Sequence, residues 1–125
     1  MLIHIEPHSI IPIYAQVRNG ILEGIVRGDL KPGDALPSVR SFAADLGVNM
    51  HTVNKSYHEL EDKGFIQIVP KSGAIILKPD EPTKERIDLI ASTVRPLLAE
   101  ALATGMTDEQ VQDMIRSIQS SIKGE

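Results

Sequence analysis

The sequence predicts a mainly α-helical fold with a small β wing: a winged helix-turn-helix domain at residues 10–78, followed by a two-helix dimerisation region at residues 79–125. Three observations support this prediction. Two short helical patterns meet at the turn Gly47-Val48-Asn49, and two segments rich in β-branched residues follow them directly. A Pro-Asp-Glu-Pro stretch at 79–82 then separates these elements from two further amphipathic segments.

A first helix is expected to begin at Pro12 and to end at Arg27 and Gly28. Proline suits the first turn of a helix because its missing N–H has no partner there. Gly20 and Gly24 lie one turn apart inside this helix, which indicates close packing against a neighbouring segment. Apolar residues recur every four positions and form a stripe that faces a core: Ile13, Val17, Ile21 and Ile25.

The helix-turn-helix is expected after a turn-rich segment at 29–34 and a very short extended piece at 35–36. Ser38 is the expected N-cap of the second helix, which Gly47 ends. Asn49 is the expected N-cap of the third helix, which Gly64 closes. The predicted core residues here are Leu46, Val48, Val53, Tyr57 and Leu60. The residues left to face outward are Met50, His51, Asn54, Lys55 and His58.

A β-hairpin is predicted from strands at 65–69 and 74–77, joined by a four-residue turn at 70–73. A hairpin directly after a helix-turn-helix forms a wing. The predicted tip carries Lys71, Ser72 and Gly73, a cation, a hydroxyl and a residue without a side chain. Such a tip can approach phosphates or a minor groove closely.

Two further helices are predicted after the linker. The first runs from Thr83 to about Gly105 with Pro96 inside it, where a kink is expected. A capping box at 107–110 opens the second. The apolar faces of these helices can be buried either against the winged domain or against the same helix pair from a second chain. We favour the second arrangement, a homodimer, because regulators that read two half-sites need one. The expected dimerisation residues are Ile87, Ile90, Val94, Leu97, Leu98, Leu102, Val111, Ile115 and Ile118.

Composition restricts the class of protein. There is no cysteine, so neither a disulfide framework nor a thiolate metal site is expected. Neither a signal peptide nor an apolar run long enough to cross a membrane is evident, which predicts a soluble cytoplasmic protein. The net charge of −4 is unusual for a nucleic-acid binder. However, residues 1–79 carry eight basic and eight acidic side chains, and residues 80–125 carry five and nine, so the excess negative charge lies in the C-terminal third.

Nothing in the sequence predicts an enzyme, a cofactor or a metal site. His51 and His58 are separated by about 10.5 Å of helix rise, too far for both to bind one ion without a third element. The segment 58–61 begins like a zinc-protease helix but lacks the second histidine. The sequence contains neither a phosphate-binding glycine loop nor a G-x-S-x-G motif.

The spaced motif over residues 10–78 resembles the winged helix-turn-helix of GntR-type bacterial transcription regulators. The residues that carry this resemblance are Leu36-Pro37-Ser38-x-Arg40, Ala43, Leu46-Gly47-Val48, Thr52-Val53, Glu59-Leu60-Glu61, Gly64-Phe65-Ile66 and Gly73. The short C-terminal region and the run from Val48 to Leu60 are similar to the YtrA-like branch. Other branches often place arginine where this chain has Met50 and Asn54.

The resemblance implies a DNA-binding site and a regulatory role. The DNA contacts it implies come from Arg40, Asn49, His51, Thr52, Asn54, Lys55 and Gly73, and the wing tip adds Lys71 and Ser72. Arg40 suits a phosphate or a guanine, and Asn54 suits an adenine. YtrA-like regulators are often repressors of transporter operons and of their own genes, so the expected partners are a near-palindromic DNA operator and a second copy of the chain; any small-molecule effector is unknown.

Two classes of function remain open from the sequence. The first is a dimeric DNA-binding repressor. The second is a winged helix that serves as a protein-interaction module without specific DNA binding. The polar third helix and Lys71 favour DNA. A weaker third reading, an effector held by the C-terminal helices, has little support because so short a region with few aromatic residues offers little pocket.

Overall fold

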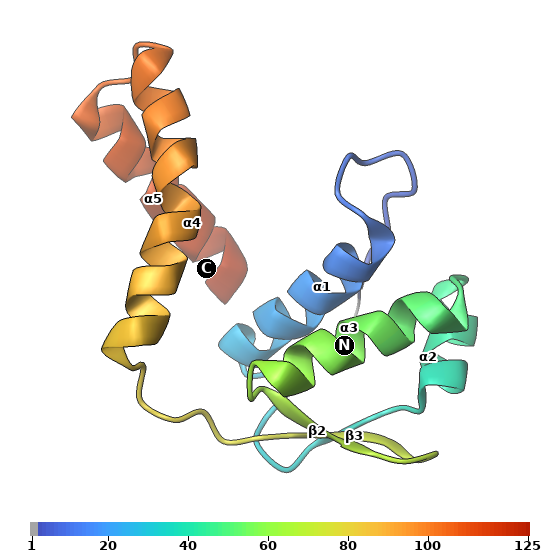
Figure 1. Ribbon diagram of the computed structural model, residues 1–125. Coiled ribbons are helices and arrows are strands. Elements are labelled where there is room, and N and C mark those ends of the chain that lie inside the picture. The colour runs from blue at the N-terminus through green and yellow to red at the C-terminus, as the bar shows by residue number, and fades with distance from the viewer. Residues whose placement is uncertain (1–2) are drawn as a thin grey trace. The chain divides into compact units, whose positions relative to one another are not determined.

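The computed structural model describes residues 3–125 and contains five helices and three short strands within that range (Figure 1). The chain divides after Pro79 into two compact units. The elements of the first unit are α1 (Ile13–Arg27), β1 (Ala35–Leu36), α2 (Val39–Leu46), α3 (Met50–Asp62), β2 (Ile66–Val69) and β3 (Gly73–Ile76). Those of the second are α4 (Lys84–Ala103) and α5 (Asp108–Lys123).

Local signals in the sequence determine where the helices of the first unit begin and end, as predicted. The Ser38 hydroxyl accepts a hydrogen bond from the Ser41 N–H at 3.1 Å and caps α2. Gly47 ends α2 with a φ of 71°, a left-handed conformation that costs glycine little. Asn49 then caps α3 by accepting from the His51 N–H at 2.7 Å. The tight turn between α2 and α3 is therefore fixed by Gly47, which ends α2, and by Asn49, which caps α3.

The three strands form an antiparallel sheet with the order β1-β3-β2. In the hairpin, Val69 pairs with Gly73 and Ile66 with Ile76. The prediction of a four-residue turn at 70–73 was wrong in length. Gly73 is the first residue of β3, so the turn is shorter than predicted. Lys71 makes this turn possible with a φ of 66°.

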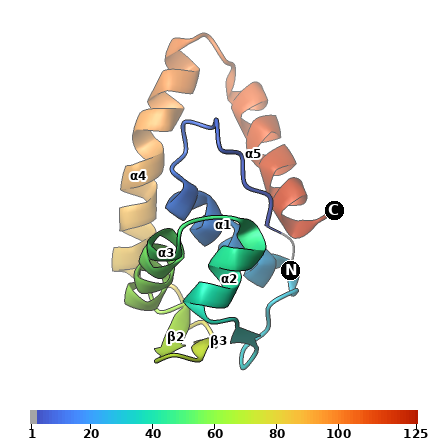
Figure 2. The ribbon, with the colours of Figure 1, turned by 90° about the vertical axis from the view of Figure 1, so that its right-hand side faces the viewer.

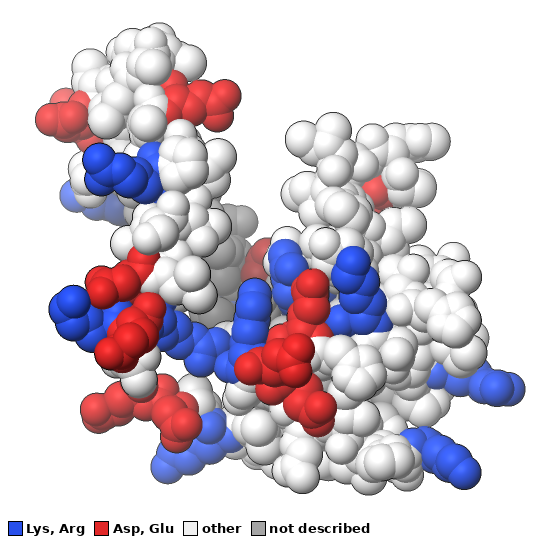
Figure 3. Space-filling model, in the orientation of Figure 1, with Lys and Arg blue, Asp and Glu red and all other residues white. Residues whose placement is uncertain are grey.

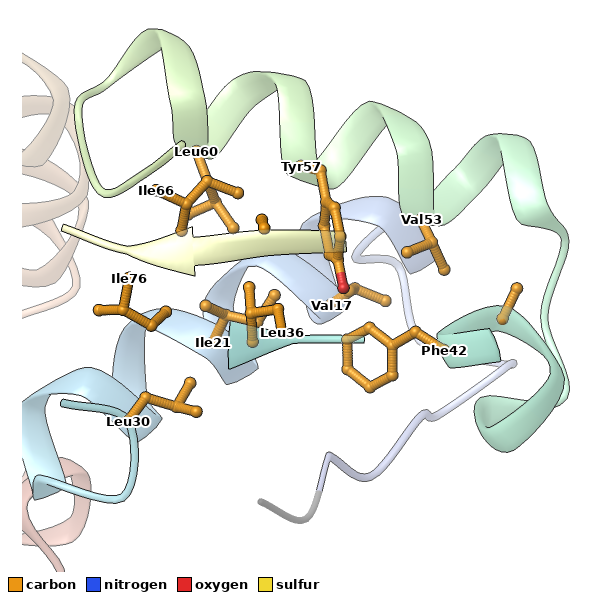
Figure 4. Packing of buried hydrophobic residues seen from close by; sticks show 12 residues of the cluster. Val17, Ile21, Leu30, Leu36, Phe42, Val53, Tyr57, Leu60, Ile66 and Ile76 are labelled. Carbon is orange, nitrogen blue, oxygen red and sulfur yellow. The ribbon is translucent and has the colours of Figure 1, made fainter. Parts of the chain in front are cut away.

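The core of the first unit lies among α1, α2, α3 and the sheet (Figure 4). Tyr57 of α3 is fully buried and reaches toward Phe42, with ring centroids 6.3 Å apart. Its hydroxyl donates a 2.7 Å hydrogen bond to the Pro37 carbonyl, which ties α3 to the segment between β1 and α2. Burial raises the pKa of the Tyr57 hydroxyl well above its ordinary value.

The segment before α1 folds back on that helix and is held by Gln16. The Gln16 amide accepts from the Glu6 N–H at 2.8 Å and donates to the Glu6 and Ile11 carbonyls at 3.0 and 2.8 Å. Ile3 lies over Gly20, where an added Cβ would be 2.8 Å from the Ile3 Cγ1. The expected close packing at Gly20 is confirmed.

The second unit is a helical hairpin, in which α4 and α5 contact each other. The two helices diverge from the turn that joins them (Figure 2). Helix α4 continues through Pro96, and Thr83 caps its first turn. The predicted capping box is present at the start of α5, where Thr107 and Gln110 exchange hydrogen bonds at 3.1 and 2.9 Å. Within residues 84–103 no side chain is buried, so the apolar stripe of α4 faces outward.

The expected dimerisation residues differ in exposure. Val111 is buried, and Leu98 and Ile115 are half-buried. The other six are exposed, with Leu97 at 64% and Ile90 at 58% of their full surface: Ile87, Ile90, Val94, Leu97, Leu102 and Ile118. Leu89 and Met114 are exposed apolar residues that the prediction did not include.

Candidate nucleic-acid interface

A groove of about 600 Å³ lies where the beginning of α2, the beginning of α3 and the hairpin meet. We call it the wing groove. Three elements that lie apart in the sequence contribute to its walls. Its lining residues are Ser38, Val39, Arg40, Met50, His51, Asn54, Ile68, Val69, Pro70, Lys71 and Gly73.

The α2 wall of the groove presents Arg40. The cap that Ser38 makes fixes where α2 begins, and Arg40 is the second residue of the helix. Its side chain is exposed, and it adjoins the half-buried Val39. An exposed guanidinium beside a groove can bind either a phosphate or the acceptor edge of a guanine.

The α3 wall of the groove is formed by the beginning of that helix. Met50 and His51 are its first two residues, and Asn54 lies one turn further on the same side. All three are exposed. Asn49 uses its side-chain oxygen as the cap and does not line the groove, and Thr52 is half-buried.

The hairpin wall of the groove is positioned by a side-chain hydrogen bond from α3 and by close packing at Gly73. The Glu61 carboxylate, near the end of α3, accepts a 2.7 Å hydrogen bond from the Ile68 N–H and ties the helix to the hairpin. Gly73 is buried against the segment before α2, since an added Cβ would lie 2.1 Å from the Leu36 carbonyl oxygen. Close packing within the protein therefore accounts for glycine at this position. Lys71, at the tip, is exposed.

Contacts between α1 and α3 fix how α3 is rotated about its axis. The Ser56 hydroxyl donates to the Tyr14 carbonyl at 2.7 Å, and the Lys55 ammonium lies 3.8 Å from the centre of the Tyr14 ring. One turn further along both helices, Arg18 pairs with Glu59 at 2.9 Å. Lys55 therefore leans toward α1 and does not line the wing groove.

The structure brings five of the nine predicted DNA-binding residues together in the wing groove: Arg40, His51, Asn54, Lys71 and Gly73. The other four do not line it: Asn49, Thr52, Lys55 and Ser72. The prediction did not include the apolar walls, of which Met50 and Val69 are 39% and 38% exposed. For Met50 a signal existed, because the helical pattern placed it facing outward; Val69 was simply part of a predicted strand.

The charges around the wing groove suit an anion. The groove is lined by one arginine, one lysine and one histidine, and its lining includes no carboxylate among the described residues. Figure 3 shows basic side chains projecting over α2 and over the hairpin tip, with no acidic side chain of the described chain between them on the visible face. Within the first unit, acidic side chains on that face gather near the C-terminal end of α3. A chain of negative net charge thus keeps a local basic surface.

Other kinds of site find no support in residues 3–125. No group of three or more His, Asp or Glu side chains in that range is arranged to hold a metal ion. None of the described helices has the length and apolar character needed to cross a bilayer.

Comparisons with known proteins identify the first unit. Residues 13–76 match the family described as bacterial regulatory proteins, gntR family. Over an alignment of 125 residues, the chain is 34% identical to the HTH-type transcriptional repressor YtrA of Bacillus subtilis, which covers 98% of this chain and 96% of that protein. The likeness to YtrA therefore includes both units.

Solved structures show the same architecture. A transcriptional antiterminator from Listeria monocytogenes has a TM-score of 0.92 at 27% identity and covers all of this chain and 95% of its own. YtrA from Sulfolobus acidocaldarius, a GntR-family transcription factor, has a TM-score of 0.64 at 41% identity, with 82% of this chain and 99% of that one covered.

The first unit is also similar to a protein solved with DNA. The DNA-binding domain of AraR in complex with its operator ORX1 has a TM-score of 0.52 at 28% identity, covering 58% of this chain and 90% of that domain. The chain therefore belongs to the GntR family, in its YtrA-like branch, and is a winged helix-turn-helix transcription regulator rather than an enzyme.

Proposed function

We propose that this protein is a homodimeric repressor that binds a near-palindromic DNA operator through its two wing grooves. The observation that carries the proposal is the wing groove itself, in which Arg40, His51, Asn54 and Lys71 converge from three elements. The beginning of a recognition helix enters the major groove first, and α3 presents Met50, His51 and Asn54 there. The AraR domain, which has a similar fold, was solved in complex with operator DNA.

The surface of the second unit supports the proposed dimer. Helix α4 exposes Ile87, Ile90, Val94, Leu97 and Leu102, although contiguous apolar surface is costly to leave in water. A second copy of the same hairpin offers a matching stripe, as a symmetric interface requires. Two copies would present two α3 helices to successive half-sites of one operator.

We also propose that the regulated genes are its own operon and a transporter operon, and that it acts as a repressor. This part rests on the likeness to YtrA, which is named as a repressor, and on the targets common in the YtrA-like branch. An effector that releases the protein from DNA is left open.

The test measures, by fluorescence anisotropy at several salt concentrations, how tightly the full chain binds the DNA upstream of its own operon. Binding should favour this DNA over shuffled DNA and should weaken steeply with salt, by about 0.9 log units per log unit of salt for each phosphate contacted. Equal binding to both DNAs would contradict the proposal and would favour the protein-interaction alternative.

Arg40→Ala sharpens this test. It should weaken binding by about 1–3 kcal/mol, because it removes a charged hydrogen-bonding group from the groove. A salt slope that falls by about one unit identifies a phosphate contact, and an unchanged slope with relaxed sequence preference identifies a guanine contact. Lys31→Ala is the matched control, because Lys31 is an exposed cation of the same unit that does not line the groove.

A further inference from the structure

The wing groove combines a basic rim with an apolar wall. Met50 of α3 and Val69 of β2 are 39% and 38% exposed, and both line the groove together with the half-buried Val39 and Ile68. An apolar wall contributes nothing to phosphate binding, which needs cations and hydrogen-bond donors. It would be complemented by an apolar group on the ligand.

Duplex DNA offers one apolar group in its major groove. Guanine, adenine and cytosine present only acceptors and donors there, whereas thymine also presents its C5-methyl group. A methionine side chain is long, unbranched and polarizable, so it can reach and cover such a methyl. Met50 is the first residue of α3, the end of a recognition helix that enters the groove first.

Asn54 makes the assignment more specific. Met50 and Asn54 are four residues apart, so they lie on the same side of α3, separated by about 6 Å along its axis. That spacing corresponds to about two base-pair steps at 3.4 Å each. An asparagine amide pairs bidentately with adenine, the partner of thymine. The two side chains together suit a short A·T segment.

We propose that Met50 is a specificity-determining residue that contacts the methyl group of a thymine in each half-site, beside an A·T pair that Asn54 contacts. The inference rests on the proposed function, because it names what the same groove recognises. It differs from that function in predicting which base is read, and by which chemical group.

The experiment begins with selection of binding sites from a random duplex library by the full chain. An enriched near-palindrome that contains thymine supports both proposals. No enriched site would overturn the proposed function and this inference with it. An enriched site without thymine in its half-sites would overturn the inference alone.

Each thymine of the selected site is then replaced in turn by deoxyuridine, which lacks only the methyl group. At one position of the half-site the wild-type protein should bind about fourfold more weakly, the equivalent of one buried methyl group. Met50→Ala should bind the thymine and deoxyuridine duplexes equally at that position. Met50→Leu, which keeps an apolar side chain of similar size, should still distinguish them.

Folding does not confound this comparison, because Met50 is exposed at the first position of a helix and alanine and leucine are both good helix formers. Circular dichroism of the three proteins checks this. Two results would overturn the inference: wild-type protein that is insensitive to every deoxyuridine, or a Met50→Ala variant that retains the full sensitivity.

Discussion

The two units of this chain place their apolar side chains in opposite ways. In the first, α1, α2, α3 and the sheet enclose a core in which Val17, Ile21, Val53 and Leu60 are fully buried. In the second, α4 buries no side chain within residues 84–103, and Leu97 keeps 64% of its surface exposed. Packing of an amphipathic face supplies most of the stability of a protein helix. The first unit therefore has the packing that a single chain needs, whereas the second leaves the apolar face of α4 uncovered.

The largest effect is expected from a charge on the uncovered face of α4. Leu97→Glu should leave a monomer folded, because the side chain is exposed, but should weaken the proposed dimer. A loss of about 2 kcal/mol in each copy, present twice in a symmetric interface, corresponds to roughly a thousandfold rise in the dimer Kd. Sedimentation velocity across a range of concentrations measures this change.

The matched control for this variant is Ala99→Glu. Ala99 is also exposed on α4 but lies about 200° around the helix from Leu97. This variant adds the same charge and should leave the dimer intact. If both variants, or neither, dissociate the protein, the apolar stripe of α4 is not the dimer interface.

The next largest effect is the loss of stability when a tightly packed glycine, rather than one with free space around it, is replaced by alanine. Gly73 and Gly105 have nearly the same φ, 97° and 96°, but an added Cβ meets the Leu36 carbonyl oxygen at 2.1 Å in the first case and nothing described within 4 Å in the second. Both alanine variants incur the cost of a left-handed backbone, about 1–2 kcal/mol. Gly73→Ala must also displace the backbone at 36–37.

We therefore expect Gly73→Ala to lower the free energy of unfolding by at least about 2 kcal/mol more than Gly105→Ala. Chemical denaturation followed by circular dichroism gives both values. Equal losses would mean that the hairpin can move away from the segment before α2 at little cost. The first unit would then be less tightly packed around Gly73, relative to the second unit, than its short backbone distances indicate.

The elements could be predicted from the sequence because their signals are local. Ser38, Gly47 and Asn49 each cap a helix through atoms within three residues, and the capping box at 107–110 does the same. The start of β3 at Gly73 could not be predicted in this way, because it depends on pairing with Val69 and on Lys71 taking a left-handed conformation that its residue type disfavours.

The site was predicted only in part for a related reason. Basic and polar residues near the beginnings of α2 and α3 predicted DNA contacts by Arg40, His51 and Asn54. The structure places all three in the wing groove, and their contact with DNA stays a prediction. Whether an apolar residue such as Val69 faces the core or a groove depends on how closely the hairpin approaches α3. The position of Lys55 over Tyr14 likewise depends on the packing of two helices far apart in the sequence.

The smallest expected effect concerns the polar group inside the closed core. The Tyr57 hydroxyl is buried and donates to the Pro37 carbonyl, and its pKa is raised by burial above the ordinary value of 10.0. Above pH 10 the unfolded chain therefore releases this proton while the folded protein keeps it. The stability it contributes is fully present below pH 10 and falls by up to about 1.4 kcal/mol for each pH unit above it.

Tyr57→Phe removes both the hydrogen bond and this pH dependence. At pH 8 the variant should be about 1 kcal/mol less stable than the wild-type protein, and between pH 10 and 11 the difference should shrink or reverse. Urea denaturation at each pH measures it. Parallel curves over this range would mean that Tyr57 ionises alike in the folded and unfolded protein, and so that water reaches its hydroxyl. The hydroxyl lies where α3, α2 and β1 meet. Water at this position would mean that the core of the first unit is not closed, and so that the two units differ less in packing than their side-chain exposures indicate.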